Sequence, residues 1–284
     1  MQLAFVSTLI FSLAAVPVFG TTLAPNLGGA YSFGLLGDTI SDTGTSLVVG
    51  MVGARTKITG FSPGTATGTV FPAPSDPTVV AAYNNFVLAF NQSFSDTTTP
   101  PTQSITDLTM NRTFLGNNVF SFPLTDVIST ANINLTFDAQ SDSSEVFIIK
   151  TARDLTVNGP LTFTLKNGAQ ANNIFWIVGR NATISSGGGA VTFDGTILAG
   201  SSFTMSANPG GSGTLAGTIN GCVFAETANT LAGQTIVNGC SPSAVVVGPG
   251  VSGVPEPGSS GLAALGCLLG ALGLKKLRSV HQTE

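Results

Sequence analysis

The side chains that could carry catalytic or metal chemistry are few and poorly grouped. The only histidine, His281, stands among the last four residues, so imidazole-based metal binding and acid–base catalysis have no centre in the body of the chain. Asp138, Asp142 and Glu145 cluster before a predicted strand and could bind calcium, but their spacing fits no known calcium loop. We interpret them as a solvated turn. The sequence therefore predicts a protein that is not an enzyme and that holds no metal and no cofactor.

Threonines form the pattern with the most regular spacing. Thr156, Thr183 and Thr204 each lie between apolar residues, and Thr230 stands between Asn229 and Leu231; the four follow one another at intervals of 27, 21 and 26 residues. A period of this length, with three short strands in each period, is typical of a β-solenoid. Because side chains alternate along a strand, the apolar residues face inward and the threonines face outward. The spacing thus predicts a column of outward threonines.

Two outward columns are candidates for a binding surface. The first is the threonine column just described, with a second polar row beside it at Asn158, Ser185 and Ser206. We favour this first column because it alternates most cleanly with inward apolar residues. The alternative face consists of Thr162, Thr192, Thr214 and Thr235. Since threonine has a good β-propensity, either column also fits a plain structural surface.

One class of predicted strand is apolar on both sides, as in residues 146–149, 174–178, 196–199 and 222–225. Such a face needs a cover on its outside. Residues 77–94 supply one, because their apolar side chains recur at helical spacing after Pro77, which marks a helix start. These side chains are Val80, Tyr83, Phe86, Val87 and Phe90. We expect this helix to lie along the apolar face.

Charge and cysteine content restrict the partners and the compartment. Charged residues make up only 8% of the chain and the net charge is −4, without a basic patch, so nucleic acid is not expected as a partner. A composition rich in uncharged polar residues is typical of an exported β protein. Cys222 and Cys240 are 18 residues apart, about one coil, and we predict a disulfide between them. We expect a monomer.

Both ends of the chain have the pattern of targeting segments. Residues 3–19 are apolar and precede Gly20, so residues 1–20 are predicted to be a signal peptide, with a buried strand or a membrane anchor as the alternatives. The body is then 21–243, followed by a linker at 244–257. Residues 258–284 combine a short apolar stretch with a basic stop formed by Lys275, Lys276 and Arg278.

This C-terminal arrangement resembles the PEP-CTERM sorting tail of Gram-negative bacteria. The Pro-Glu-Pro box is Pro255, Glu256 and Pro257, and it stands directly before the apolar stretch. The resemblance implies recognition and cleavage by an exosortase-type enzyme and transient anchoring of the tail in the inner membrane. The mature protein would then be secreted or held at the cell envelope. A plain C-terminal anchor is the alternative.

The body resembles the ice-binding protein family. The resemblance is carried by residues 31–44, 58–64, 135–139, 167–176, 195–199 and 217–221, in that order. It implies an all-β-dominated fold, a right-handed, three-faced, discontinuous β-helix with a long helix alongside and an N-terminal cap. It further implies adsorption to ice through one flat Thr/Ser-rich face. The turns at 157–160, 185–188 and 208–211 depart from the Thr-Gly-x-Thr pattern of many members, and adhesion or a structural role in a bacterial surface layer is the competing hypothesis.

Overall fold

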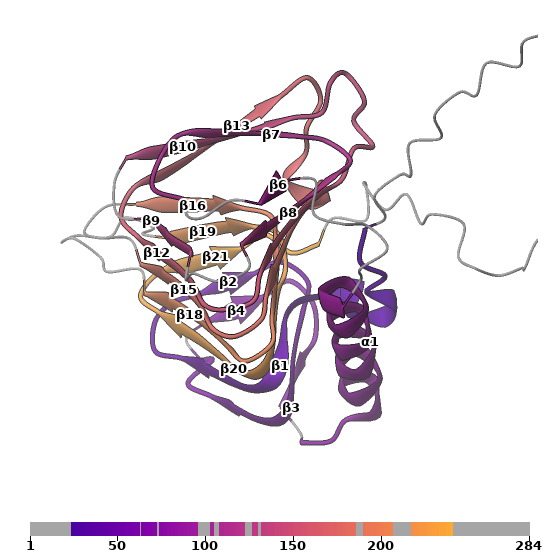
Figure 1. Ribbon diagram of the computed structural model, residues 1–284. Helices are drawn as coiled ribbons and strands as arrows, with labels where there is room; N and C mark the ends of the chain where they lie inside the picture. Colours follow the sequence, from indigo (N-terminus) through magenta and orange to yellow (C-terminus); the bar gives the residue numbers. More distant parts are fainter. Residues whose placement is uncertain are drawn as a thin grey trace, which may run out of the picture. The chain divides into compact units, whose positions relative to one another are not determined.

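Parallel strand ladders form three faces of one solenoid in the computed structural model (Figure 1). The structure describes residues 24–62, 64–72, 74–95, 103–104, 108–122, 127–129, 132–185, 190–206 and 217–240. The predicted signal peptide at 1–20, the linker at 244–257 with Pro255, Glu256 and Pro257, and the tail at 258–284 lie outside these residues. So does Thr214 of the alternative face.

Face 1 carries the strands that are apolar on both sides. Its strands are β6 (Gln103–Ser104), β8 (Asn118–Phe122), β11 (Phe147–Thr151), β14 (Ile174–Val178), β17 (Thr196–Ala199), the first parts of β20 (Val223–Ala232), β1 (Phe33–Asp42) and β3 (Met51–Thr59), and β5 (Val70–Phe71). The long strands β20, β1 and β3 turn the corner into face 2, and the ladder register shifts between Gly37 and Thr39 at this corner.

Face 2 carries the strands that alternate between apolar and hydroxyl residues. It consists of β9 (Val127–Ser129), β12 (Leu155–Asn158), β15 (Ala182–Ser185), β18 (Ser202–Ser206) and the last parts of β20, β1 and β3. Along β12, β15 and β18 every second residue is buried and the residues between are partly or fully exposed. This alternation confirms that the apolar residues of these strands face the interior.

Face 3 is divided into two sheets. One contains β7 (Arg112–Leu115), β10 (Ile133–Asp138) and β13 (Leu161–Lys166). The other contains β16 (Val191–Asp194), β19 (Gly217–Asn220), β21 (Thr235–Val237), β2 (Leu47–Val48) and β4 (Thr65–Ala66). The two short 3-10 helices are η1 (Gly28–Ser32) and η2 (Ala171–Asn173).

The order of the coils in space differs from their order in the chain. Strand β1 pairs with β20 on one side and with β3 on the other. On face 3, β21 likewise lies between β19 and β2. The last coil in sequence, β20–β21, therefore lies inside the stack, and the first coil docks onto it. This arrangement is the discontinuity of the predicted β-helix, and the predicted fold class is confirmed.

The helix α1 (Pro77–Ser95) lies along face 1 and covers it (Figure 1). Asp76 caps the N-terminus of the helix, because its carboxylate accepts a hydrogen bond from the Thr78 amide at 2.8 Å. The buried side chains of the helix pack against Phe175, Ile177, Leu198 and Phe224 of face 1; they are Val79, Ala82, Tyr83, Phe86, Ala89 and Phe90. The predicted helix at 77–94 and its position are thus confirmed. None of the helices that the structure describes is both long and apolar enough to cross a membrane.

The interior of the solenoid is filled by aromatic and branched side chains. Trp176 is 1% exposed, and its indole nitrogen donates to the carbonyl of Asp194 at 3.0 Å, so the polar end of the ring is satisfied. Phe137, Phe163 and Phe193 pack around this indole with ring centroids 5.0 to 6.5 Å away. This core fixes the strands whose outer sides form the candidate site.

Candidate functional site

The favoured threonines form one continuous column on face 2. Strand pairing places Thr156 opposite Thr183, Thr183 opposite Thr204, and Thr204 opposite Thr230. Neighbouring strands are about 4.8 Å apart, so the column presents a methyl group and a hydroxyl group at that repeat. β-branched side chains are stiff at χ1, which keeps this array ordered.

The hydroxyl groups of this column are free to contact water or a ligand. Within the part of the chain that the structure describes, Thr156, Thr183, Thr204 and Thr230 make no side-chain hydrogen bond to the protein. The four residues are partly exposed, while Leu155, Val157, Ala182, Ile184, Phe203, Met205 and Leu231 between them are at most 1% exposed. The buried apolar residues therefore fix the strands, while the threonine side chains remain accessible to solvent.

The predicted second polar row is also continuous in the ladder. Asn158 lies opposite Ser185 and Ser185 opposite Ser206, and the row then continues to Ala232. The outer side of these strands thus carries two rows of small uncharged side chains. We call the outward residues of face 2 the Thr face; its predicted members are Thr156, Asn158, Thr183, Ser185, Thr204, Ser206 and Thr230.

A hydrogen-bonded ladder borders the Thr face at the corner with face 1. The Asp154 carboxylate accepts from the backbone and side-chain nitrogens of Asn181 at 2.9 and 3.0 Å. The Asn181 side-chain oxygen in turn accepts from the Ser202 amide at 3.3 Å, and the hydroxyls of Ser202 and Thr227 are 2.7 Å apart. Because each coil is tied to the next, this border holds the strands of the Thr face in register.

The sequence interpretation missed the part of the Thr face that the N-terminal coils supply. Ser41 lies opposite Thr230, and Thr59 lies opposite Ser41, so the column runs on without a gap into β1 and β3. The alternation of Thr39, Ile40 and Ser41 was the signal that could have revealed this, because it repeats the pattern of the later strands.

One member of the alternative face, Thr235, was predicted incorrectly. Thr235 was expected to face outward, but it is fully buried, because it lies opposite Gly217 at an inward position. The outward residues of these strands are Thr218 and Ile236.

Thr192 is exposed and pairs with Thr218, whereas Thr162 belongs to the other sheet of face 3 and lies opposite Asn134. The column is also broken by apolar side chains, since Leu47 lies opposite Ile236 and is 39% exposed. Face 3 therefore carries no continuous hydroxyl array among the described residues.

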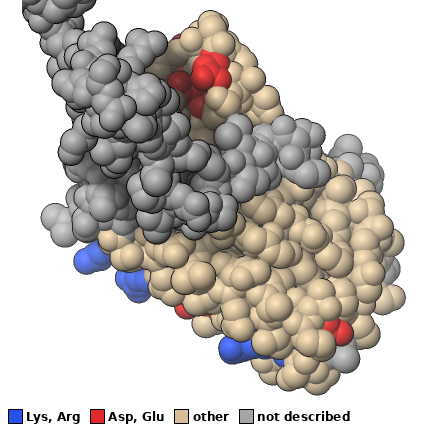
Figure 2. Space-filling view, turned by 90° about the vertical axis from the view of Figure 1, so that its right-hand side faces the viewer, with Lys and Arg blue, Asp and Glu red and all other residues tan. Residues whose placement is uncertain are grey.

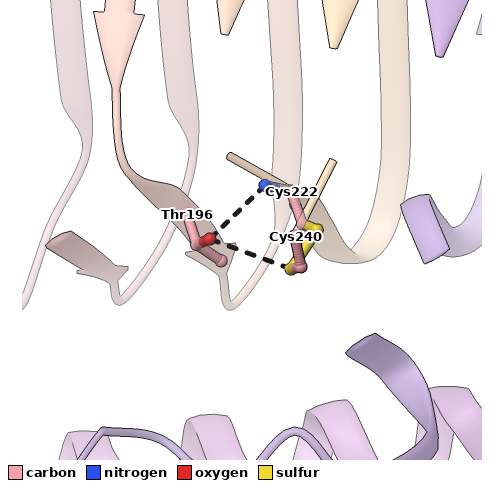
Figure 3. Close-up of a disulfide and its surroundings, with 3 residues drawn as sticks. All are labelled: Thr196, Cys222 and Cys240. Carbon is pink, nitrogen blue, oxygen red and sulfur yellow. Dashed lines mark hydrogen bonds between the residues drawn. A yellow bond between two sulfur atoms is a disulfide. The ribbon is translucent and has the colours of Figure 1, made fainter. Parts of the chain in front are cut away.

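Cys222 and Cys240 are joined by a disulfide, with their Cα atoms 5.0 Å apart (Figure 3). Cys222 stands just before β20, and Cys240 follows β21, so the bond joins the end of a face 3 strand to the start of a face 1 strand. The Thr196 hydroxyl accepts a hydrogen bond from the Cys222 amide at 3.4 Å. This corner lies across the solenoid from the Thr face.

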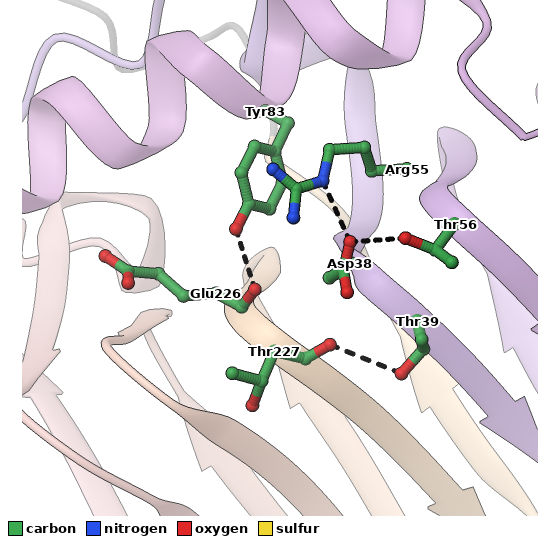
Figure 4. Close-up of polar contacts among 7 residues, drawn as sticks. All are labelled: Asp38, Thr39, Arg55, Thr56, Tyr83, Glu226 and Thr227. Carbon is green, nitrogen blue, oxygen red and sulfur yellow. Dashed lines mark hydrogen bonds and ion pairs between the residues drawn. The ribbon is translucent and has the colours of Figure 1, made fainter.

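A polar cluster fixes the N-terminal coils and α1 to the last coil (Figure 4). Arg55 donates to Asp38 at 2.8 Å and lies over the Tyr83 ring at 4.7 Å. The Tyr83 hydroxyl donates to the Glu226 carbonyl at 2.7 Å. Burial opposes charge on Asp38, but the hydrogen bonds from Thr56 and Arg55 outweigh it and hold the pKa of this carboxyl below its usual value.

The described surface offers little for ionic or metal chemistry. Figure 2, which views the side that carries α1, shows isolated charged groups separated by wide uncharged areas. No group of three or more His, Cys, Asp or Glu side chains that could hold a metal ion occurs within the described ranges. Asp138 ends β10, Asp142 and Glu145 follow it before β11, and the Asp142 carboxylate accepts hydrogen bonds from the Ser144 amide and hydroxyl.

The fold and the Thr face define a class of protein: a discontinuous three-sided β-solenoid with a covering helix and one face that carries a column of outward hydroxyl residues. The family model described as ice-binding-like matches residues 35–237. The chain belongs to this family.

Similar proteins and solved structures that are named ice-binding proteins support membership in this family. An ice-binding protein of Flavobacterium frigoris (strain PS1) is 29% identical over 232 residues, which cover 74% of this chain and 75% of the relative. The crystal structure of an ice-binding protein from the Antarctic ascomycete Antarctomyces psychrotrophicus is 30% identical, with a TM-score of 0.64, covering 77% of this chain and 98% of that chain. An ice-binding protein domain from Shewanella frigidimarina, 22% identical with a TM-score of 0.62 over 78% of this chain and 99% of that chain, shares the fold.

Proposed function

We propose that this protein binds ice through the Thr face and thereby limits the growth or recrystallisation of ice. The observation that carries the proposal is the unbroken column Thr156, Thr183, Thr204 and Thr230, whose hydroxyls have no partner within the described part of the chain. The family supports it, because named relatives are ice-binding proteins. No enzymatic activity, cofactor or nucleic-acid partner is part of the proposal.

The physical basis is a match between a rigid surface and ordered water. A hydroxyl and a methyl group recur about every 4.8 Å along the column, near the spacing of water sites on ice surfaces. Because β-branched side chains are already restricted in χ1, little conformational entropy is lost when the face contacts ice. The small, uncharged neighbours Ser185 and Ser206 leave the surface flat.

Export and processing belong to the same proposal. We propose that residues 1–20 direct export, and that the Pro255-Glu256-Pro257 box and residues 258–284 serve an exosortase-type enzyme after transient membrane anchoring. Cys240, the last described residue, lies across the solenoid from the Thr face. We propose that the mature protein acts as a monomer that is secreted or held at the cell envelope.

Microscopy of ice crystals grown in the purified protein tests the proposal. Faceted or arrested crystals at protein concentrations where an albumin control leaves round discs are the expected result. Round, freely growing discs would contradict ice binding. Such a result would favour the second candidate, adhesion or a structural role in a bacterial surface layer, for which the uncharged Thr face is also suited.

A further inference from the structure

The Thr face does not end at the last coil of the chain. Thr230 lies opposite Ser41 of β1, and Ser41 lies opposite Thr59 of β3, so two more hydroxyl residues extend the central column. Ser41 is partly exposed and Thr59 is exposed. In the described residues neither side chain has a hydrogen-bond partner within the protein. These two positions therefore offer water the same groups as Thr183 and Thr204.

The row beside the column shows where the uniform surface stops. In this row Ser202 lies opposite Ala228, Ala228 opposite Thr39, and Thr39 opposite Lys57. The first three residues are small and uncharged, whereas Lys57 is exposed and carries a charge. No ion pair of Lys57 occurs within the part of the chain that the structure describes.

Lys57 is poorly suited to contact with an ordered water layer. An ammonium group is a compact and strongly hydrated charge, and its own hydration shell competes with an ice-like arrangement of water. Its four-carbon stem also has many rotamers, which would be lost on contact with a rigid surface. Thr39 on the preceding strand has neither property.

The N-terminal coils are fixed firmly enough to share a surface with the later coils. Both ladders of β1 shift register at the same place, between Gly37 and Thr39, so β20, β1 and β3 turn the corner together. The Thr39 hydroxyl donates to the Thr227 carbonyl at 3.2 Å (Figure 4). The link between Arg55 and Asp38 joins β3 to β1 in the same corner.

We propose that the ice-contacting surface is assembled from both ends of the chain, that it continues over Ser41 and Thr59, and that Lys57 sets its boundary at the N-terminal coils. This inference rests on the proposed function, because it assigns further contact residues to the same face. It predicts that the N-terminal coils take part in contact with ice, as well as closing the end of the solenoid.

Ser41→Tyr tests the extension of the surface in the purified full-length protein. A bulky outward side chain there should remove crystal shaping as completely as Thr204→Tyr does. The matched control is Thr65→Tyr, which changes an exposed threonine of the N-terminal coils on face 3 and should leave shaping intact. Thermal unfolding of each variant shows that the fold is kept.

Lys57→Thr tests the boundary. The gap between the melting and freezing temperatures of a seeded crystal should widen relative to the unmutated protein at equal concentration. Lys57→Glu, which keeps a charge at this position, should give no gain, and Lys166→Thr on face 3 is the matched control that should give none either.

The outcomes separate the two proposals. If Thr204→Tyr loses shaping while Ser41→Tyr keeps it and Lys57→Thr gains nothing, the surface ends at the last coil and this inference is overturned, although ice binding stands. If the unmutated protein never shapes ice, the proposed function fails and the inference fails with it. Loss in Ser41→Tyr together with a gain in Lys57→Thr supports the inference.

Discussion

Thr230 in the last coil of the chain lies directly opposite Ser41 in the first coil, across a parallel ladder of β20 and β1. The two residues are 189 positions apart in sequence, so the Thr face is complete only when both ends of the chain have come together. Closing a loop over such a separation costs conformational entropy. The polar cluster of Arg55, Asp38, Tyr83 and Glu226, which joins the N-terminal coils and α1 to the last coil, helps to offset this cost.

The hydrogen bond between Tyr83 and the Glu226 carbonyl should contribute measurably to stability. Tyr83→Phe removes this 2.7 Å bond but keeps the ring packed in the helix interface, and we expect a loss of about 1 kcal/mol in the free energy of unfolding. Denaturant unfolding measures the change. Because Tyr83 belongs to α1 over face 1 and is not one of the outward residues of the Thr face, ice shaping should stay unchanged. Unaltered stability would show that the bond contributes little to folding.

Asp42 should destabilise the protein at neutral pH. The residue is 1% exposed, and one of its oxygens has no hydrogen-bond partner in the described residues. That oxygen and the carbonyl oxygens of Phe61 and Ser46 all lie close to Gly64. Burial raises the pKa of Asp42 above its usual value, and the hydrogen bonds from Gly44 and Ser46 only partly oppose it.

The sign of the pH effect follows from this direction. Between the unfolded and the folded pKa of Asp42, the unfolded chain has lost the proton while the folded protein still holds it. The contribution of Asp42 to the free energy of unfolding is therefore fully present below the unfolded pKa and is lost as pH rises through the folded pKa. Asp42→Asn should therefore raise the free energy of unfolding at pH 7 by about 1 kcal/mol, with a smaller gain near pH 3.

A matched variant controls for the loss of a charge. Asp142 is exposed, and hydrogen bonds from the Ser144 hydroxyl and amide hold its pKa below the usual value. Asp142→Asn should give no gain at pH 7. Thermal unfolding of both variants across pH 3 to 8 provides the measurement, and an equal gain in both would count against the account of Asp42.

The disulfide should stabilise the corner where the last described residue leaves the body. Loop entropy for a closed segment of this length predicts that Cys240→Ala costs about 3 kcal/mol in unfolding free energy. Labelling of the denatured, unreduced full chain should detect one thiol, that of Cys267. Three labelled thiols would show that Cys222 and Cys240 are not bonded in the purified protein.

Cleavage of the C-terminal tail by an exosortase-type enzyme should lower the mass of the mature protein. In cells that contain an exosortase, the mature product should end near the box of Pro255, Glu256 and Pro257. Intact-mass measurement of the envelope-associated protein reports this end directly. A product that still carries Glu284 would argue that the segment at 258–284 is a permanent anchor.

The sequence predicted the fold well because the fold depends on local patterns. The alternation of residues around Thr156, Thr183 and Thr204 predicted which side of each strand is buried. The apolar run at 174–178 predicted that another element covers the outside of this face, and α1 does so. Periodicity of this kind survives turns of variable length, since each coil buries its own inward residues.

The errors arose where register depends on partners distant in sequence. Thr235 begins a strand of only three residues, and its complete burial opposite Gly217 shows that it faces inward. The alternation of Thr39, Ile40 and Ser41 indicates that Ser41 faces outward, but its place beside Thr230 follows only from the pairing of β1 with β20. A one-residue change of register moves a side chain to the other side of the sheet, and a short strand does not specify it.

The central claim is that the Thr face contacts ice, and Thr204→Tyr compared with Thr192→Tyr tests it most directly. Both residues face outward on strands of the solenoid, so both variants should keep their thermal stability within about 0.5 kcal/mol. Crystals grown in the Thr204→Tyr protein should be round and unarrested, as they should with Thr183→Tyr, while the Thr192→Tyr protein should shape ice as the unmutated protein does. Loss of shaping with Thr192→Tyr and its retention with Thr204→Tyr would contradict the account.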